Sequence, residues 1–520
     1  MREVAEWHVY EVELESERDY ENPIWDVEPI VTFSAPSGAE HTVEAFWDGG
    51  RTWRARFSPG ERGRWSWRSD CRGARDDGLC GRVSEFDCVR YEGRDLTYLR
   101  GPVEMSVDRR RFVHADGAPF FWLADTAWNG AIRSREEDWD LYLRKRNEQG
   151  FSVIQFVTTQ WRGCSRDPHG EVAYRTEGEK LAVNPKWFRR LDRRVRAVND
   201  HGLVAAPVVL WACTESDPGR ALAPEKAARL ARYIVSRYQA HHVVWILGGD
   251  GDYREPHAER WAAIGREAFR AQLDRPVAMH LGGQSWIADE LREEGWLDVI
   301  GYQSGHGSSE EHLRWLVEGP PTRQWNEGPE QAVLNMEPNY EGHPSYHEDL
   351  VFNDRHVRRA AYWSLLLTPT AGVSYGNNNI WAWQARPERA EGHEGLGWIG
   401  PWRDGLEPPG VHCMVLLERF FDSISWWELR PAPHLAARQP GRQDPARFVA
   451  AAMSETGDLA VLYTPRGGTL KLDVMALQRP ARARWYNPRK GGYVEAGTVE
   501  GEQAELRTPD RRDWVLKIER

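Results

Sequence analysis

The sequence predicts an α/β protein: a (β/α)8 TIM barrel flanked by an N-terminal and a C-terminal β-sandwich. Within residues 99–425, eight short apolar runs alternate with helix-length amphipathic segments, a pattern typical of parallel β/α units. On both sides of this region the chain changes to short strands separated by turn residues, which favours sandwiches. The length of 520 residues also exceeds what a single core organises, so several domains are expected.

Residues 1–98 are expected to form the N-terminal sandwich. Alternating stretches such as 7–12, 42–47 and 52–57 are separated by Asp-Gly-Gly and Ser-Pro-Gly turn signals. Residues 426–520 return to short strands and are expected to form the C-terminal sandwich. Its segments 459–463 and 469–472 flank a Pro- and Gly-containing turn, which predicts a hairpin.

The predicted barrel consists of short apolar runs bounded by Gly or polar residues, as in strands that are buried on both faces. The candidate strands are 120–125, 152–158, 204–210, 243–247, 277–281, 299–303, 332–336 and 372–375. The candidate helices are 136–148, 187–198, 225–239, 257–273, 310–317, 355–367 and 411–421. A doubly wound open sheet is the alternative, but no Gly-rich dinucleotide-binding motif follows any of these strands.

Composition narrows the class of partner. The net charge of -11 and the pI near 5.9 argue against a nucleic-acid partner, which would need a basic face. No apolar run is long enough to span a membrane, and the N-terminus has no apolar signal segment, so the chain as given is expected to be cytoplasmic. The sequence does not indicate an oligomeric state.

The six cysteines are sparse and contain no CxxC pair, so they do not suggest a metal site. Cys71 and Cys80 could close a loop as a disulfide, but we expect reduced, unpaired thiols. The first candidate strand has no HxH motif, and His241-His242 begins a strand instead of ending one, which argues against a catalytic zinc ion. No GxSxG motif supports a serine nucleophile. No metal and no cofactor is expected.

Two candidate strands end in a carboxylate, Asp250 and Glu337. They are strands four and seven of the count, and the carboxyl ends of barrel strands form the mouth where barrel enzymes carry out their chemistry. Cleavage of a glycosidic bond needs one protonated carboxyl group and one ionised carboxylate. The Gly248-Gly249 pair is expected to let the backbone turn sharply and a ligand approach. A helix cap at Asp250 and a loop salt bridge at Glu337 are the structural alternatives.

Other strand ends carry polar and aromatic groups that together suit a sugar pocket. His280 could equally be a structural histidine, and Asp125 could orient a neighbour through a buried hydrogen bond. The candidate substrate-binding residues are Asp125, Trp128, Gln160, Trp161, Trp211, His280, Tyr302, Gln303, Tyr340, Asn377, Trp381 and Trp383.

Several motifs resemble one known family. The segment 112–128, the run Trp245-Ile246-Leu247-Gly248-Gly249-Asp250 and the run Asn335-Met336-Glu337-Pro338 are similar to motifs of the apiosidase-like glycoside hydrolase barrels of the DUF4038 type. Segments 46–50 and 64–67 resemble the DUF5060 sandwich that precedes such barrels, and 485–489 resembles a small sandwich described as a candidate collagen-binding domain.

The resemblance implies a glycoside hydrolase in which Asp250 is the acid/base and Glu337 the nucleophile. It also reveals a departure, because the related retaining clan of barrel glycosidases has Asn-Glu where this chain has Gly249-Asp250. We therefore expect a glycosidase of retaining mechanism and exo action on a carbohydrate. A non-catalytic carbohydrate-binding protein and a polysaccharide lyase are the alternatives. Carboxylates more than about 10 Å apart, or ion-paired to Arg, would favour the binding protein.

Overall fold

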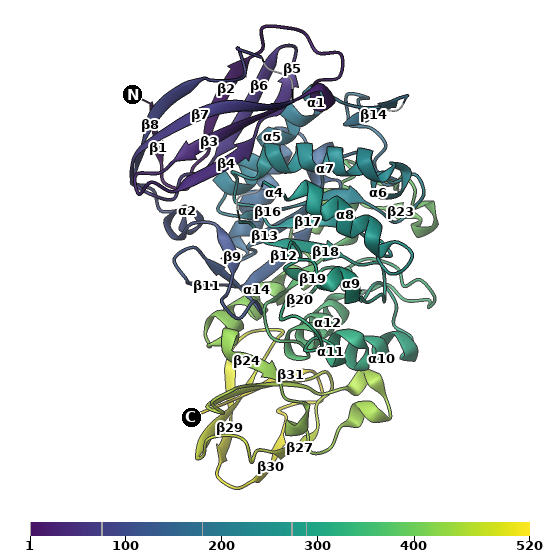
Figure 1. Cartoon of the computed structure of the whole chain (residues 1–520). Helices are drawn as coiled ribbons and strands as arrows, with labels where there is room; N and C mark the ends of the chain where they lie inside the picture. Colours follow the sequence, from purple (N-terminus) through teal and green to yellow (C-terminus); the bar gives the residue numbers. More distant parts are fainter. Residues whose placement is uncertain (1, 74–75, 179, 272–273, 288) are drawn as a thin grey trace.

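The computed structural model describes residues 2–73, 76–178, 180–271, 274–287 and 289–520. Figure 1 shows a central α/β region with a β-rich domain at each end, and the two chain termini lie in these outer domains. The fold class expected from the sequence, a barrel between two β-sandwiches, is confirmed.

The central sheet has eight parallel strands in the order β20-β19-β18-β17-β16-β13-β12-β21. Beyond the two strands at the ends of this order, Glu341 and Asn377 form a parallel bridge, with the Glu341 N–H 2.9 Å from the Gly376 carbonyl, and this bridge closes the ring at the mouth. The strands are β12 (Trp122–Thr126), β13 (Val153–Val157), β16 (Val204–Trp211), β17 (Trp245–Gly249), β18 (Val277–His280), β19 (Val299–Tyr302), β20 (Ala332–Asn335) and β21 (Gly372–Tyr375).

Seven longer helices surround this sheet, close to the predicted positions. Asn184 and Asn353 cap two of them by accepting the N–H groups of Lys186 and Arg355, and Pro occupies the first turn of three. The helices are α4 (Glu136–Glu148), α5 (Pro185–Asp200), α7 (Pro224–Tyr238), α8 (Ala258–Ala268), α10 (Glu310–Glu318), α12 (Asp354–Leu366) and α14 (Pro409–Asp422). Residues 272–273 of the expected helix 257–273 lie outside the described residues.

Shorter elements interrupt the barrel pattern, and the sequence did not predict them. They are the sheet of β9 (Val103–Met105), β10 (Phe112–His114) and β11 (Pro119–Phe120); the hairpins β14 (Tyr174–Glu177)/β15 (Lys180–Val183) and β22 (Glu388–Arg389)/β23 (Trp398–Ile399); the helices α3 (Gly130–Arg133), α6 (Pro218–Ala221), α9 (Asp289–Arg292), α11 (Pro320–Arg323) and α13 (Asn378–Ala382); and the 3-10 turns η1 (Glu394–Leu396), η2 (Trp402–Gly405) and η3 (Trp426–Glu428). No helix in the described ranges combines the length and the apolar character that crossing a bilayer would need.

The N-terminal domain packs a five-stranded sheet, β1-β8-β7-β3-β4, against a three-stranded sheet, β2-β6-β5. Their inner faces enclose a core that includes Val31, Phe33, Trp65 and Phe86. The elements are β1 (Arg2–Ala5), β2 (Tyr10–Glu15), α1 (Pro23–Asp26), β3 (Val27–Ser34), β4 (Glu40–Glu44), β5 (Phe46–Gly49), β6 (Thr52–Phe57), β7 (Gly63–Gly73), β8 (Val83–Val89) and α2 (Leu96–Arg100).

The expectation of unpaired Cys71 and Cys80 is wrong, because the structure joins them in a disulfide. The turn after β7 folds back, with the Cys80 N–H bound to the Asp76 carbonyl, and this brings the two Cα atoms to 5.6 Å, within bridging range. Disulfides persist mainly in oxidising compartments. The pair therefore weighs against the expected cytoplasmic location, which stays a prediction.

The C-terminal domain packs a six-stranded sheet, β24-β25-β26-β31-β28-β29, with the pair β27-β30. Arg358 of α12 is buried and donates to both carboxylate oxygens of Asp513, at 2.6 and 3.1 Å, which ties this domain to the barrel. The elements are β24 (Leu429–Pro431), η4 (Pro433–Leu435), η5 (Pro440–Arg442), η6 (Pro445–Arg447), β25 (Ala450–Ser454), β26 (Leu459–Thr464), β27 (Thr469–Asp473), β28 (Ala481–Tyr486), β29 (Tyr493–Val499), β30 (Gln503–Arg507) and β31 (Trp514–Glu519).

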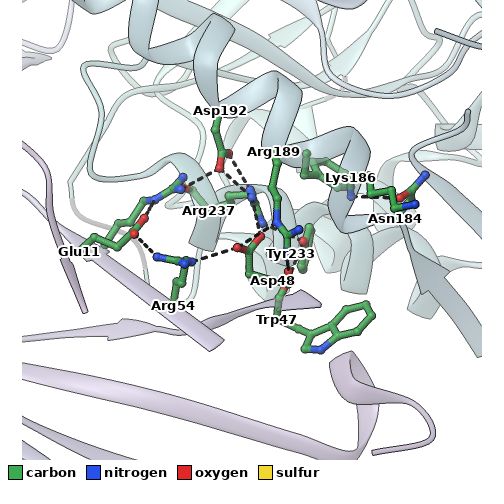
Figure 2. A network of polar contacts seen from close by, with 12 residues as sticks. Glu11, Trp47, Asp48, Arg54, Asn184, Lys186, Arg189, Asp192, Tyr233 and Arg237 are labelled. Carbon is green, nitrogen blue, oxygen red and sulfur yellow. Dashed lines mark hydrogen bonds and ion pairs between the residues drawn. The ribbon is translucent and has the colours of Figure 1, made fainter. Parts of the chain in front are cut away.

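A network of charged groups joins the N-terminal domain to the barrel (Figure 2). The fully buried Arg237 of α7 donates to Asp48 of β5 at 2.9 Å and to Asp192 of α5 at 2.7 Å. Arg56 of β6 also donates to Asp192, at 2.8 Å. Burial would raise the pKa of Asp192, but Arg56 and Arg237 outweigh it and hold the pKa well below its usual range. Asp192 is therefore the shared counter-ion of two buried guanidinium groups.

We expect Asp192→Ala to lower the free energy of unfolding by about 3–5 kcal/mol, because it leaves both guanidinium groups buried without this partner. Chemical denaturation at pH 7 measures the loss. Asp19→Ala removes the partner of Arg51 in a solvent-exposed pair and is the control, with no measurable change expected. Equal effects of the two substitutions would contradict the assignment of Asp192.

Candidate active site

The two predicted carboxylates follow β17 and β20, strands four and seven of the barrel, and lie at its carboxyl end. Glu337 is buried, with 7% of its surface exposed, and Asp250 is half-buried. Asp250 adopts a left-handed backbone with a φ of 49°, which is uncommon for a residue with a side chain. Such a conformation persists only where the surroundings enforce it.

The glycines before Asp250 have a different role from the one expected. Neither Gly248 nor Gly249 has a positive φ, so the turn is made by Asp250 itself. A Cβ on Gly248 would lie 2.5 Å from the Tyr253 hydroxyl, and one on Gly249 would lie 2.6 Å from the Trp211 ring. The two glycines therefore make room for aromatic side chains at the mouth.

Glu337 is held by two histidines. The Nε2 atom of His306 lies 3.0 Å from Glu337 Oε1, and the Nε2 atom of His280 lies 3.3 Å from Oε2. On the other side of each ring, His280 Nδ1 accepts the backbone N–H of Asp250 at 3.0 Å, and His306 Nδ1 accepts the backbone N–H of Tyr340 at 3.4 Å. Because an accepting Nδ1 carries no proton, we infer that the Nε2 side of each ring, which faces the carboxylate, is the protonated one.

These contacts determine the charge of Glu337. Burial would raise the pKa of Glu337, but the contacts with His280 and His306 outweigh it and hold the pKa well below its ordinary value. The lowered pKa favours the ionised form of Glu337 at neutral pH. A carboxylate that is hydrogen-bonded at Oε1 and has a second histidine 3.3 Å from Oε2 is also restricted in orientation, which suits a group that must attack along a defined direction.

Asp250 has the opposite electrostatic environment. Burial, and next the negative charge of Glu337, raise the pKa of Asp250 to about 6, while His280, Arg162 and Cys213 act more weakly in the other direction. The Arg162 guanidinium lies 3.7 Å from Asp250 Oδ2. Asp250 is thus able to carry a proton near neutral pH while Glu337 stays charged. Two carboxyl groups with separated pKa values can serve as proton donor and as nucleophile or base.

Aromatic side chains form a wall beside this pair. The ring centroids of Trp128 and Trp211 lie 5.2 Å apart, those of Trp161 and Trp211 4.5 Å apart, and those of Trp128 and His280 5.6 Å apart. Trp128 Nε1–H donates to the Tyr340 hydroxyl at 3.0 Å. The structure therefore gathers five of the predicted substrate-binding residues around the two carboxylates.

Four other predicted residues lie near this wall, and they differ in whether their side chains already have hydrogen-bond or packing partners. Gln303 Oε1 is buried and has no hydrogen-bond partner among the described residues, so it could accept from a substrate hydroxyl. The Trp381 ring packs 4.8 Å from His393. Asn377 accepts the Asn379 N–H as the cap of α13, and Gln160 binds the backbone of the segment before β14 through Tyr174 and Ala173.

The last three predicted substrate-binding residues contact other side chains of the barrel instead of the two carboxylates. Asp125 is fully buried and accepts from Arg146 Nε at 2.5 Å and from the Tyr142 hydroxyl at 2.7 Å. The Tyr302 ring lies 6.0 Å from Trp315 of α10, on the outer side of the sheet. Trp383 stacks on Trp402 at 4.7 Å. These three side chains are structural, and we do not include them in the proposed sugar site.

Four further residues lie at the site and were not predicted from the sequence: His306, Arg162, Tyr346 and His393. All four lie on loops, where no periodic pattern indicates which side chain faces the mouth. Tyr346 is 57% exposed, and its ring lies 5.5 Å from that of His306. One usable signal was the position of His306, three residues after the strand-six Gln303. Among the described residues, no group of three or more His, Cys, Asp or Glu side chains could hold a metal ion.

Solved structures with the same fold are glycoside hydrolases. A structure described as a glycoside hydrolase aligns with a TM-score of 0.71 and 23% identity over 81% of this chain and 97% of its own. A glycoside hydrolase family 5 protein from Bacteroides vulgatus ATCC 8482 gives 0.70 and 22%, over 81% of this chain and 94% of its own. A second protein from that organism, described as a candidate glycoside hydrolase, gives 0.74 and 16% over 100% of both chains. No curated protein matches the chain.

Sequence models of three families match the chain in order. The N-terminal residues 3–72 match DUF5060, a domain of unknown function, and residues 431–519 match a candidate collagen-binding domain of a collagenase. The model that matches residues 106–428, more than half of the chain, is the apiosidase-like catalytic domain. The match to this catalytic domain shows that the chain is a glycosidase, an enzyme that acts on a carbohydrate. The chain belongs to the apiosidase-like family.

Proposed function

We propose that the protein is a retaining glycosidase in which Glu337 is the nucleophile and Asp250 the acid/base. The observation that carries this proposal is the contrast between the two carboxyl groups, one fixed and ionised between two histidines and the other with its pKa raised to about 6. The contrast gives each residue one role in a two-carboxylate reaction.

The proposed reaction has two steps. A Glu337 oxygen attacks the anomeric carbon while Asp250 gives its proton to the leaving oxygen, which breaks the glycosidic bond and forms a glycosyl ester on Glu337. Asp250, now ionised, takes a proton from a water molecule that attacks the same carbon and releases Glu337. Because Nε2–H of His280 and of His306 faces Glu337, both histidines hold the carboxylate in place during the attack and stabilise it when it leaves.

The contact between Arg162 and Asp250 bears on the rival reading, a carbohydrate-binding protein. An ion pair between either carboxylate and Arg is expected to favour that reading, and Arg162 does form one with Asp250, at 3.7 Å. Arg162 does lower the pKa of Asp250, but burial and the charge of Glu337 act more strongly in the other direction. The raised pKa supports a proton donor instead. Exo action and contact of the predicted residues with substrate stay predictions.

The stereochemistry of the product tests the mechanism. A screen of 4-nitrophenyl glycosides identifies a hydrolysed sugar, and proton NMR of the first product then reports its anomeric configuration. We expect the configuration of the substrate, because two successive displacements restore it. An inverted first product would contradict Glu337 as nucleophile, and an unsaturated sugar that absorbs in the ultraviolet would indicate a lyase.

A further inference from the structure

The hairpin of β22 and β23 follows strand eight of the barrel and lies beside the candidate site. Its strands pair Glu388 with Ile399 and Arg389 with Trp398. In Figure 1, β23 lies at the edge of the barrel region, on the side where β14 and α6 are also found. The hairpin strand β14 follows β13, whose loop carries Arg162, and α6 follows β16, whose loop carries Cys213.

The hairpin is fixed to the loop that carries Arg162. Glu391 Oε1 accepts the Ser165 N–H at 3.2 Å, and Oε2 lies 3.3 Å from Arg133 Nη2. A Cβ on Gly392 would lie 2.5 Å from the Arg162 carbonyl oxygen, so the two backbones are in close contact. Because Arg162 in turn lies 3.7 Å from Asp250, this contact places the hairpin on the Asp250 side of the mouth.

The two faces of the hairpin differ in burial. His393 packs between Trp381 at 4.8 Å and Trp161 at 5.8 Å, and Ile399 is buried. Trp398 points away from them and is 70% exposed, and it is the one exposed tryptophan among the described residues. An indole offers a wide apolar face and one N–H donor, and leaving that face in water forgoes the free energy of burying it.

We propose that Trp398 is a stacking platform for a sugar of the leaving group, one ring or more beyond the ring next to the cleaved bond. This proposal rests on the proposed function. The acid protonates the leaving oxygen, so the Asp250 side of the mouth faces the leaving group. A pyranose or furanose ring presents C–H groups that match the indole face, and Arg389, which pairs with Trp398 across the hairpin, is a charged donor for its hydroxyls. The expected ligand is therefore an oligosaccharide and not a single sugar.

Two probes with the same cleaved sugar test the platform. One is the 4-nitrophenyl glycoside, whose leaving group ends at the first ring, and the other carries a disaccharide as leaving group. We expect Trp398→Ala to raise KM for the second probe about tenfold, which corresponds to about 1.4 kcal/mol, and to leave both kinetic constants for the first unchanged. Trp398→Phe, which keeps a ring face, should retain most of the affinity.

Met475→Ala changes a side chain of similar exposure in the C-terminal sandwich and is the control, with no effect expected on either probe. The proposal is overturned if Trp398→Ala leaves KM for the disaccharide probe unchanged, or if it weakens both probes equally. Equal unfolding temperatures of the variant and the parent confirm that the fold is intact. Failure of the platform leaves the Glu337 assignment standing, because that assignment is tested by the 4-nitrophenyl probe alone.

Discussion

Replacement of Glu337 with Gln is expected to reduce kcat by at least about 10⁴-fold, the scale seen when the nucleophile of a covalent mechanism is removed. The amide keeps the shape of the side chain but has neither the negative charge nor the nucleophilic oxygen. The measurement is steady-state hydrolysis of the glycoside found by screening, followed by mass spectrometry of enzyme trapped with a slow 2-fluoro glycoside. In the parent enzyme the label should map to the peptide that contains Glu337.

Asp349→Asn supplies the matched control for this experiment. Asp349 is an exposed carboxylate on the same loop, and no contact of its side chain with the site occurs in the described structure, so its rate should stay within about twofold of the parent. Parent-level activity of Glu337→Gln on the same substrate would remove Glu337 from the role of nucleophile. A label on another residue would have the same consequence.

The second large effect concerns the pH dependence of the reaction. Since the pKa of Asp250 is raised to about 6, Asp250 is protonated below that pH and ionised above it, so kcat/KM should fall as the pH rises through about 6. The acid limb should lie well below pH 4, because Glu337 stays ionised there. Asp250→Asn should remove the fall on the alkaline side and lower the rate on poor leaving groups by about 10²–10⁴-fold.

With an activated dinitrophenyl leaving group the same substitution should cost much less in the first step, because that group needs little protonation. Asp252→Asn is the control: this carboxylate lies two residues on, pairs with Arg254 and should leave the pH profile as it is. An unchanged alkaline limb in Asp250→Asn would show that another group is the proton donor.

The barrel could be predicted from the sequence because parallel strands are buried on both faces and therefore appear as apolar runs, as in 243–247 and 332–336. The helices could be predicted because their ends carry local signals, such as Asn184 and Asn353. The two carboxylates followed from the same pattern, since each comes directly after such a run.

The rest of the site depends on tertiary contacts that leave little local signal. His306 and Arg162 reach the carboxylates through the conformations of their loops. The sequence near Arg162 gives no sign of that approach, and for His306 the one local signal is its position three residues after Gln303. The sequence places both Tyr302 and Gln303 at the mouth, but the Tyr302 ring packs against Trp315 of α10, and only Gln303 has a buried side-chain oxygen left without a partner among the described residues. Adjacent strand residues alternate between the two faces, so only one of these side chains could face inward.

Both outer domains are attached to the barrel by a buried arginine on a barrel helix: Arg237 binds Asp48 of the N-terminal sandwich, and Arg358 binds Asp513 of the C-terminal one. Because the catalytic-domain match ends at residues 106 and 428, a fragment with these bounds is the obvious minimal catalytic domain to produce. Such a fragment would keep the two guanidinium groups and lose these carboxylate partners, with apolar surface newly exposed around them. We therefore expect the isolated barrel to be less stable than the whole chain, so that engineering of this enzyme should carry all three domains together.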